Sequence, residues 1–161
     1  MNKRIVILGA GESGAGSALL AQKKGFDVFV SDSGTVKDKY RDILASHNIA
    51  FEEGKHTPEL IMNAGEVIKS PGLHEDNPLV VAIREKGIPV ISEIEFAGRY
   101  TDAIKICVTG SNGKTTTTNL IYHMMKKAGL NVAMTGNVGN SFAMAVAQGG
   151  YDYYVIELSS F

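Results

Sequence analysis

The residues with the clearest capacity for chemistry form a glycine-rich loop, Thr-Gly-Ser-Asn-Gly-Lys-Thr at positions 109–115, between an apolar run and a helical stretch. Its backbone N–H groups can surround phosphate oxygens, the Lys114 ammonium can reach the outer phosphates, and the Thr115 hydroxyl can bind Mg²⁺. The full phosphate-binding pattern asks for a glycine five residues before Gly113, where this chain has Val108. The loop is therefore a shortened variant, Gly-x-x-Gly-Lys-Thr. The alternative is an ordinary helix N-terminus with a solvated lysine. The predicted ATP-binding residues are Gly110, Ser111, Asn112, Gly113, Lys114, Thr115 and Thr116.

A carboxylate that could share the metal ends a later apolar run. Glu157 follows Tyr-Tyr-Val-Ile at positions 153–156. Enzymes with a phosphate-binding loop hold their metal with an acidic residue at the tip of a neighbouring parallel strand. We therefore predict Lys114 and Glu157 as catalytic residues, and Thr115 and Glu157 as Mg²⁺ ligands. The alternative is a surface glutamate at the end of a strand.

A second glycine-rich turn lies near the N-terminus, where Gly-Ala-Gly-Glu-Ser-Gly occupies positions 9–14. It fits G-x-G-x-x-G between a predicted strand and a predicted helix, the context in which the helix N-terminus receives phosphate. Asp32 closes the next strand, where its carboxylate can accept hydrogen bonds from ribose hydroxyls. Glu12 argues against an ordinary dinucleotide site, because its charge would repel a pyrophosphate. Either its side chain points to solvent, or the ligand lies differently from NAD.

A third turn, Ser70-Pro71-Gly72, follows a predicted strand that ends at Lys69. Open α/β sheets bind ligands at this edge, although a plain Pro-Gly turn is the simpler interpretation.

The elements that must position these turns alternate between strand and helix. Such alternation predicts parallel sheets covered by helices, joined by right-handed crossovers. The predicted class is α/β, with a Rossmann-like parallel-sheet domain over residues 1–98 and the incomplete start of a P-loop ATPase domain over 99–161. The strands are predicted at 4–8, 26–30, 49–53, 66–69, 87–91, 104–108, 130–134 and 153–158. Helices are predicted at 13–24, 36–47, 78–86, 115–127 and 141–148, with a short one from Pro58.

Three strands and two helices are too few to bury a core of their own, so we expect a part of a longer protein.

The composition excludes several classes of protein. Sixteen Lys and Arg against 17 Asp and Glu give a net charge of −1 without a basic tract, which argues against a nucleic-acid partner. Cys107 is the single cysteine, so no internal disulfide forms; we expect it to be a small core residue in a buried strand. No apolar run is long enough for a signal peptide or a membrane span. These features predict a cytoplasmic protein without membrane insertion.

Taken in order, the motifs resemble those of the Mur ligases of bacterial cell-wall synthesis, a superfamily that includes folylpolyglutamate synthase. The variant loop Thr-Gly-Ser-Asn-Gly-Lys-Thr-Thr is typical of it. The Gly-Ala-Gly-Glu-Ser-Gly turn, the Ser-Pro-Gly turn and the closing Glu-Leu-Ser-Ser-Phe at 157–161 resemble the members that add D-glutamate to UDP-N-acetylmuramoyl-L-alanine. The resemblance spans the whole chain, which would be about a third of such an enzyme.

The resemblance implies an ATP-dependent amide ligation through an acyl phosphate, with UDP-N-acetylmuramoyl-L-alanine and D-glutamate as substrates, Mg²⁺ as the metal and a monomeric parent. It implies a set of residues around the UDP-sugar: Glu12, Ser13, Gly14, Asp32, Ser33, Ser70, Pro71, Gly72, Asn137 and Ser159. Asn137 and Ser159 would meet the sugar end. Because the family's remaining machinery lies beyond position 161, we expect this chain alone not to ligate. The alternatives are another Mur-type ligase, a folylpolyglutamate synthase-like enzyme, or a non-catalytic module that binds NAD at residues 9–14.

Overall fold

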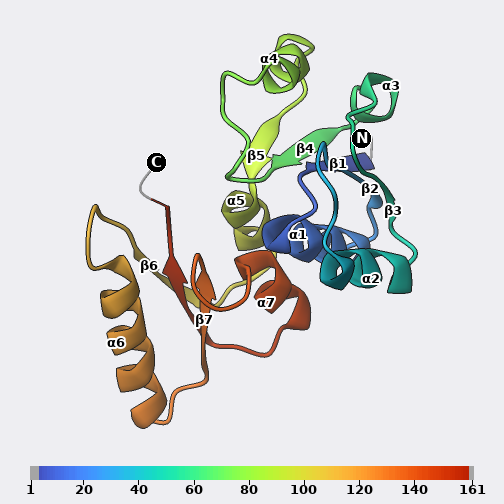
Figure 1. Ribbon diagram of the computed structural model, residues 1–161. Helices are drawn as coiled ribbons and strands as arrows, with labels where there is room; N and C mark the ends of the chain where they lie inside the picture. The colour runs from blue at the N-terminus through green and yellow to red at the C-terminus, as the bar shows by residue number, and fades with distance from the viewer. Residues whose placement is uncertain (1–3, 160–161) are drawn as a thin grey trace.

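The computed structural model describes residues 4–159 and contains two parallel sheets, one after the other along the chain (Figure 1). The first has the strand order β3-β2-β1-β4-β5 and the second the order β6-β8-β7. Every pairing is parallel, as the alternation of strands and helices predicts. The α/β class and the Rossmann-like first sheet are confirmed.

The first sheet is built from short, buried apolar runs. Its strands are β1 (Arg4–Leu8), β2 (Asp27–Ser31), β3 (Ala50–Glu52), β4 (Glu66–Lys69) and β5 (Val90–Ser92). Side chains alternate across β1: Ile5 and Ile7 join one core cluster, and Val6 and Leu8 join another on the opposite face. Both faces of the sheet are therefore covered, which explains why β1 is a continuous apolar run rather than an alternating one.

Five helices provide this cover. They are α1 (Glu12–Lys23), α2 (Asp38–Ser46), α3 (Pro58–Ile61), α4 (Pro78–Glu85) and α5 (Glu93–Gly98). The last was not predicted, because it has only six residues and follows β5 directly, with Ser92 as its N-cap. The predicted edge position of the strand with Pro89 is confirmed, since β5 ends the order of strands.

The second sheet consists of β6 (Ile104–Val108), β7 (Val132–Gly136) and β8 (Tyr153–Glu157), with helices α6 (Lys114–Lys127) and α7 (Phe142–Gln148). Strand β7 begins two residues later than predicted, because Leu130 closes the end of α6 with a backbone hydrogen bond to Met125. Helix α7 packs against α1 and α5 of the first part, whereas α6 lies on the far side of the second sheet (Figure 1).

One hydrophobic cluster runs through both parts of the chain. Phe142, Tyr154 and Ile156 belong to the same buried cluster as Ile5 and Leu20. Gly16 of α1 lets this packing occur, since a Cβ there would lie 2.8 Å from the backbone N of Met144. The small second sheet thus buries its inner face against the first part, consistent with its having too few elements for a separate core.

The expected burial of Cys107 is wrong. The cysteine is exposed, because β6 is an edge strand and the side chains along it are exposed or half-buried. Ile104 on β6 and Met124 on α6 are 58% and 62% exposed. An apolar strand predicted to have helices on both faces is therefore only partly covered here. Within residues 4–159, no helix has both the length and the apolar character to cross a membrane.

Candidate active site

The Gly9–Gly14 turn and the Ser70–Gly72 turn meet at the carboxyl ends of β1, β2 and β4. The Gly9 N–H donates to Ser31 O at 2.8 Å, and the Ser70 N–H donates to Leu8 O at 2.9 Å. Gly9 has φ +98°, and a Cβ on it would lie 2.8 Å from the Ser70 Cβ. Only glycine fits this crossing, so the Gly9–Gly14 turn and the Ser70–Gly72 turn form one continuous surface.

The carboxylate of Asp32 stabilises the surface formed by these two turns through hydrogen bonds to the backbone. Its Oδ2 accepts from the Ala10 N–H at 2.6 Å, and its Oδ1 accepts from the Gly34 N–H at 2.8 Å. A cavity of about 240 Å³ lies beside it, lined by Leu8, Gly9, Gly11, Asp32, Ser33, His56, Ser70, Gly72 and Leu73. A second cavity, of about 260 Å³, opens on the other side of Asp32, next to Ala10 and Tyr40. Asp32, the predicted ribose-binding residue, therefore lines two cavities.

The side chain of Glu12 reaches the second part of the chain. Its Oε1 accepts a hydrogen bond from the Ser141 N–H at 3.2 Å, just before α7. The carboxylate thus has a partner other than solvent, and its negative charge is directed to the positive end of a helix. This contact removes the objection that the Glu12 charge must oppose an anion in the turn.

Glu93 is a second carboxylate at the same helix end, and sequence reasoning missed it. It is 5% exposed, and its Oε1 accepts from the Ala143 N–H at 2.6 Å. Burial raises the pKa of Glu93 to about 7; the nearby Glu12 charge adds to this effect, while backbone hydrogen bonds from Ala143 and Phe142 oppose it. No local signal could have identified it, since its partners lie 50 residues away along the chain.

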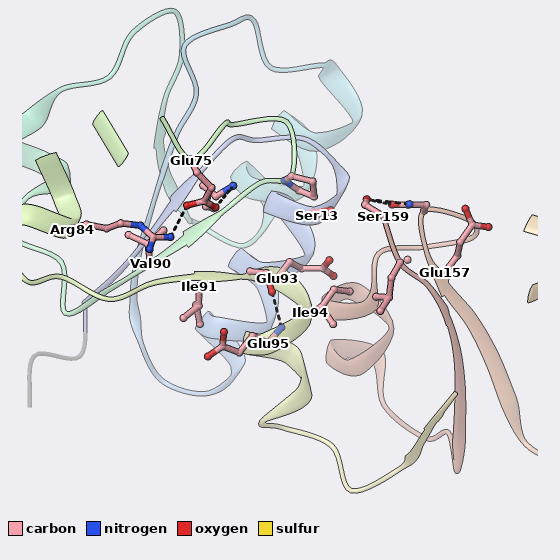
Figure 2. A pocket seen from close by; sticks show the side chains of 16 residues that line it. Ser13, Glu75, Arg84, Val90, Ile91, Glu93, Ile94, Glu95, Glu157 and Ser159 are labelled. Carbon is pink, nitrogen blue, oxygen red and sulfur yellow. Dashed lines mark hydrogen bonds and ion pairs between the residues drawn. The ribbon is translucent and has the colours of Figure 1, made fainter. Parts of the chain in front are cut away.

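The largest of these cavities, of about 480 Å³, lies between the two parts of the chain. Figure 2 shows Ser13, Glu75 and Glu93 of the first part across from Glu157 and Ser159 of the second. Pro71 and Asn137 also line it. Asn137 Nδ2 donates to Ser159 Oγ at 3.2 Å, which joins the ends of β7 and β8. Of the residues predicted for the UDP-sugar, this cavity brings together Ser13, Pro71, Asn137 and Ser159.

The phosphate loop, residues 109–115, follows β6 and leads into α6. Gly113 is the N-cap of α6 with φ +75°, a left-handed conformation that favours glycine. Lys114 is half-buried and its Nζ donates to Gly110 O at 2.6 Å, so the ammonium folds over the loop. Ser111, Asn112, Thr115 and Thr116 are exposed. The loop has the strand–loop–helix geometry expected of a phosphate site.

Glu157 lies beside this loop in the register of the sheet. On the central strand β8, it pairs with Val108 on one side and with Gly136 on the other. It is 5% exposed, yet its Oε2 has no hydrogen-bond partner within the described residues. A buried carboxylate oxygen without a partner is costly, and a divalent cation would compensate it. Residues 4–159 hold no group of three or more His, Cys, Asp or Glu side chains arranged for a metal. A metal here would depend on Glu157, the Thr115 hydroxyl and phosphate oxygens.

Models of known protein families match both parts of the chain. The sequence model of the MurD N-terminal domain matches residues 4–79, and that of the Mur ligase middle domain matches residues 108–161. The chain belongs to the Mur ligase family. It is 67% identical over 159 residues to the UDP-N-acetylmuramoylalanine--D-glutamate ligase of Bacteroides thetaiotaomicron, covering 99% of this chain and 36% of that protein. The corresponding ligase of Bacillus thuringiensis is 40% identical over 167 residues, with 99% and 36% covered.

The chain corresponds to the N-terminal portion of these MurD ligases and spans about a third of their length. Among solved structures, a pseudomurein peptide ligase type C from Methanothermus fervidus matches with a TM-score of 0.57 and 27% identity, over 98% of this chain and 33% of that one. UDP-N-acetylmuramate-alanine ligase from Thermotoga maritima matches with a TM-score of 0.60 at 23% identity, over 97% and 37%. The latter likeness shows a shared fold. In the closing motif, Ser160 and Phe161 lie outside the described residues.

Proposed function

We propose that this chain is the nucleotide- and phosphate-binding part of a ligase that joins D-glutamate to UDP-N-acetylmuramoyl-L-alanine, using ATP, in the cytoplasm. The observation that carries the proposal is a cavity whose lining joins two sites: Ser13 and Pro71 come from the glycine turns of the first part, and the buried Glu157, in register beside the phosphate loop, comes from the second. The 67% identity to the Bacteroides thetaiotaomicron ligase supports D-glutamate as the amino acid.

In this proposal, residues 1–98 bind the UDP-sugar and residues 99–161 begin the ATP-binding domain. The uridine diphosphate would lie along the joined turns at Gly9 and Ser70. The sugar and its alanyl carboxylate would extend into the cavity between the two parts, towards Asn137 and Ser159. In this orientation the alanyl carboxylate would lie at the end of β8, close to the phosphate loop.

The reaction needs activation, because a carboxylate is a poor electrophile at neutral pH. The alanyl carboxylate would attack the γ-phosphorus of ATP, with ADP leaving, to form an acyl phosphate. The D-glutamate amine would then attack the acyl carbon, lose a proton and expel phosphate to form the amide. Lys114 and the loop N–H groups stabilise the charge on the transferred phosphoryl group. Mg²⁺, held by Glu157 and Thr115, would neutralise charge on the phosphate oxygens.

A binding experiment tests the part of this proposal that the chain itself contains. We expect the 161-residue chain to bind UDP-N-acetylmuramoyl-L-alanine in isothermal titration calorimetry, and to show no ligation without the rest of the ligase. An Asp32→Ala variant should bind more weakly, because it loses both the ribose acceptor and the brace on Ala10. Glu85→Gln, an exposed change on α4, is the matched control and should bind like wild type. No heat at millimolar ligand, or a preference for NAD over UDP, would contradict the assignment.

A further inference from the structure

A hydrogen-bond network beside the cavity of about 240 Å³ determines which ring nitrogen of His56 carries a proton. Ser31 lies at the end of β2 and is fully buried. Its Oγ lies 2.7 Å from Glu52 Oε1 and 2.7 Å from His56 Nδ1. Glu52 also accepts from the Thr57 N–H at 2.8 Å and from the Thr57 hydroxyl. The imidazole is thus attached through a single serine to a carboxylate that already has several donors.

The direction of each hydrogen bond in this network follows from counting protons. Burial raises the pKa of Glu52, but hydrogen bonds from Thr57 and Ser31 outweigh that effect and lower the pKa overall. The carboxylate is therefore ionised and can only accept. The Ser31 hydroxyl has one proton, which it must donate to Glu52. Its oxygen can then only accept from His56, so the His56 Nδ1 carries a proton.

A neutral imidazole with a proton on Nδ1 leaves Nε2 as a hydrogen-bond acceptor. His56 lines the same cavity as Asp32 and Ser33 at the end of β2. Its Nδ1 is engaged by the buried Ser31, so Nε2 is the ring atom left for a ligand. Part of the remaining lining suits a flat ring: Gly11 and Gly72 have no side chains, and Leu73 is apolar.

We propose that His56 is a specificity-determining residue that accepts a hydrogen bond from the imide N3–H of uracil through Nε2. This inference rests on the proposed function, which supplies a uridine nucleotide as the ligand. Uracil and cytosine differ at this position, since N3 of uracil carries a proton and N3 of cytosine has only a lone pair. The fixed acceptor on His56 would therefore favour UDP and oppose CDP.

Nucleotide titrations provide the first test. We expect the wild-type chain to bind UDP about tenfold more tightly than CDP, the difference that one hydrogen bond to the half-buried His56 makes. His56→Phe keeps a ring but has no acceptor, so the preference should fall to about twofold or less. His56→Gln is the conservative variant: its amide can present oxygen or nitrogen, so it should retain UDP binding and improve CDP binding. An unchanged preference in His56→Phe would overturn the inference.

The tautomer itself provides the second test, and it does not depend on any ligand. The ¹⁵N chemical shifts of His56 in the folded chain should show a protonated Nδ1 and an unprotonated Nε2. Ser31→Ala removes the acceptor for Nδ1 and should produce a mixture of tautomers, with a smaller preference for UDP. A proton on Nε2 in the wild type would overturn the inference. Binding of UDP and CDP with equal affinity would contradict this inference alone, whereas failure to bind either nucleotide would contradict the proposed function as well.

Discussion

At alkaline pH, the Glu93→Gln variant should be more stable than the wild-type chain. The glutamate is buried at the junction of α5 and α7, where burial raises its pKa from 4.5 to about 7. Between these two values the folded state binds more protons than the unfolded state, so the free energy of unfolding falls as pH rises through this window. The substituted glutamine would have the same shape and an amide oxygen that can accept from the Ala143 N–H.

The size of the effect follows from the two pKa values. The destabilisation that comes from ionising Glu93 in the folded chain grows by about 2–3 kcal/mol between pH 5 and pH 8. The wild type should therefore lose about 2–3 kcal/mol relative to Glu93→Gln between these pH values. The assay is urea unfolding followed by circular dichroism at both pH values, with exposed Glu85→Gln as the control for a general change in charge. Equal pH dependence of the wild type and Glu93→Gln, within about 0.5 kcal/mol, would refute the assignment of Glu93 as a carboxylate destabilised by burial.

Three further outcomes check the packing and the phosphate loop. Gly14→Ala should destabilise the chain by about 1–3 kcal/mol in urea unfolding, because its Cβ would overlap the Gly9 carbonyl, whereas Gly11→Ala meets no atom within 4 Å and should be nearly neutral. Equal effects of the two changes would contradict the close approach of α1 to β1. Cys107 should react with a thiol reagent in the folded chain as fast as in urea, since it is exposed; strong protection would restore the buried position expected from the sequence. Lys114→Ala in the full-length ligase should abolish most of the amide formation, and unchanged turnover would count against the phosphate loop.

Local patterns in the sequence were sufficient to predict the alternation of strands and helices and the positions of the glycine-rich turns. Short runs followed by glycine-containing turns defined β1, β4 and β6 to the residue. For β1 the physical reason is burial on both faces, which needs continuous apolar side chains, whereas β6 is a partly exposed edge strand. The phosphate loop and the Gly9–Gly14 turn were identified from residue spacing alone, and both lie between a strand and a helix. The ligand contacts assigned to them remain predictions.

Features that depend on distant packing could not be predicted in this way. Helix α5 is too short for a periodic pattern, and the burial of Glu93 arises from α7, which lies 50 residues later. The exposure of Cys107 depends on its strand being at the edge of the second sheet, which the composition of β6 does not indicate. The contact of Glu12 with Ser141 likewise appears only when the two parts are packed together.

Calorimetric titration of ATP into the full-length ligase, with and without Mg²⁺, tests the phosphate loop and its glutamate most directly. We expect Lys114→Ala to weaken ATP binding by about 10–100-fold under both conditions, because it removes charge-assisted hydrogen bonds to phosphate. Glu157→Gln should keep the affinity for metal-free ATP and lose the gain that Mg²⁺ provides. Wild-type affinity and wild-type metal dependence in both variants would contradict a triphosphate held at Lys114 with its metal on Glu157.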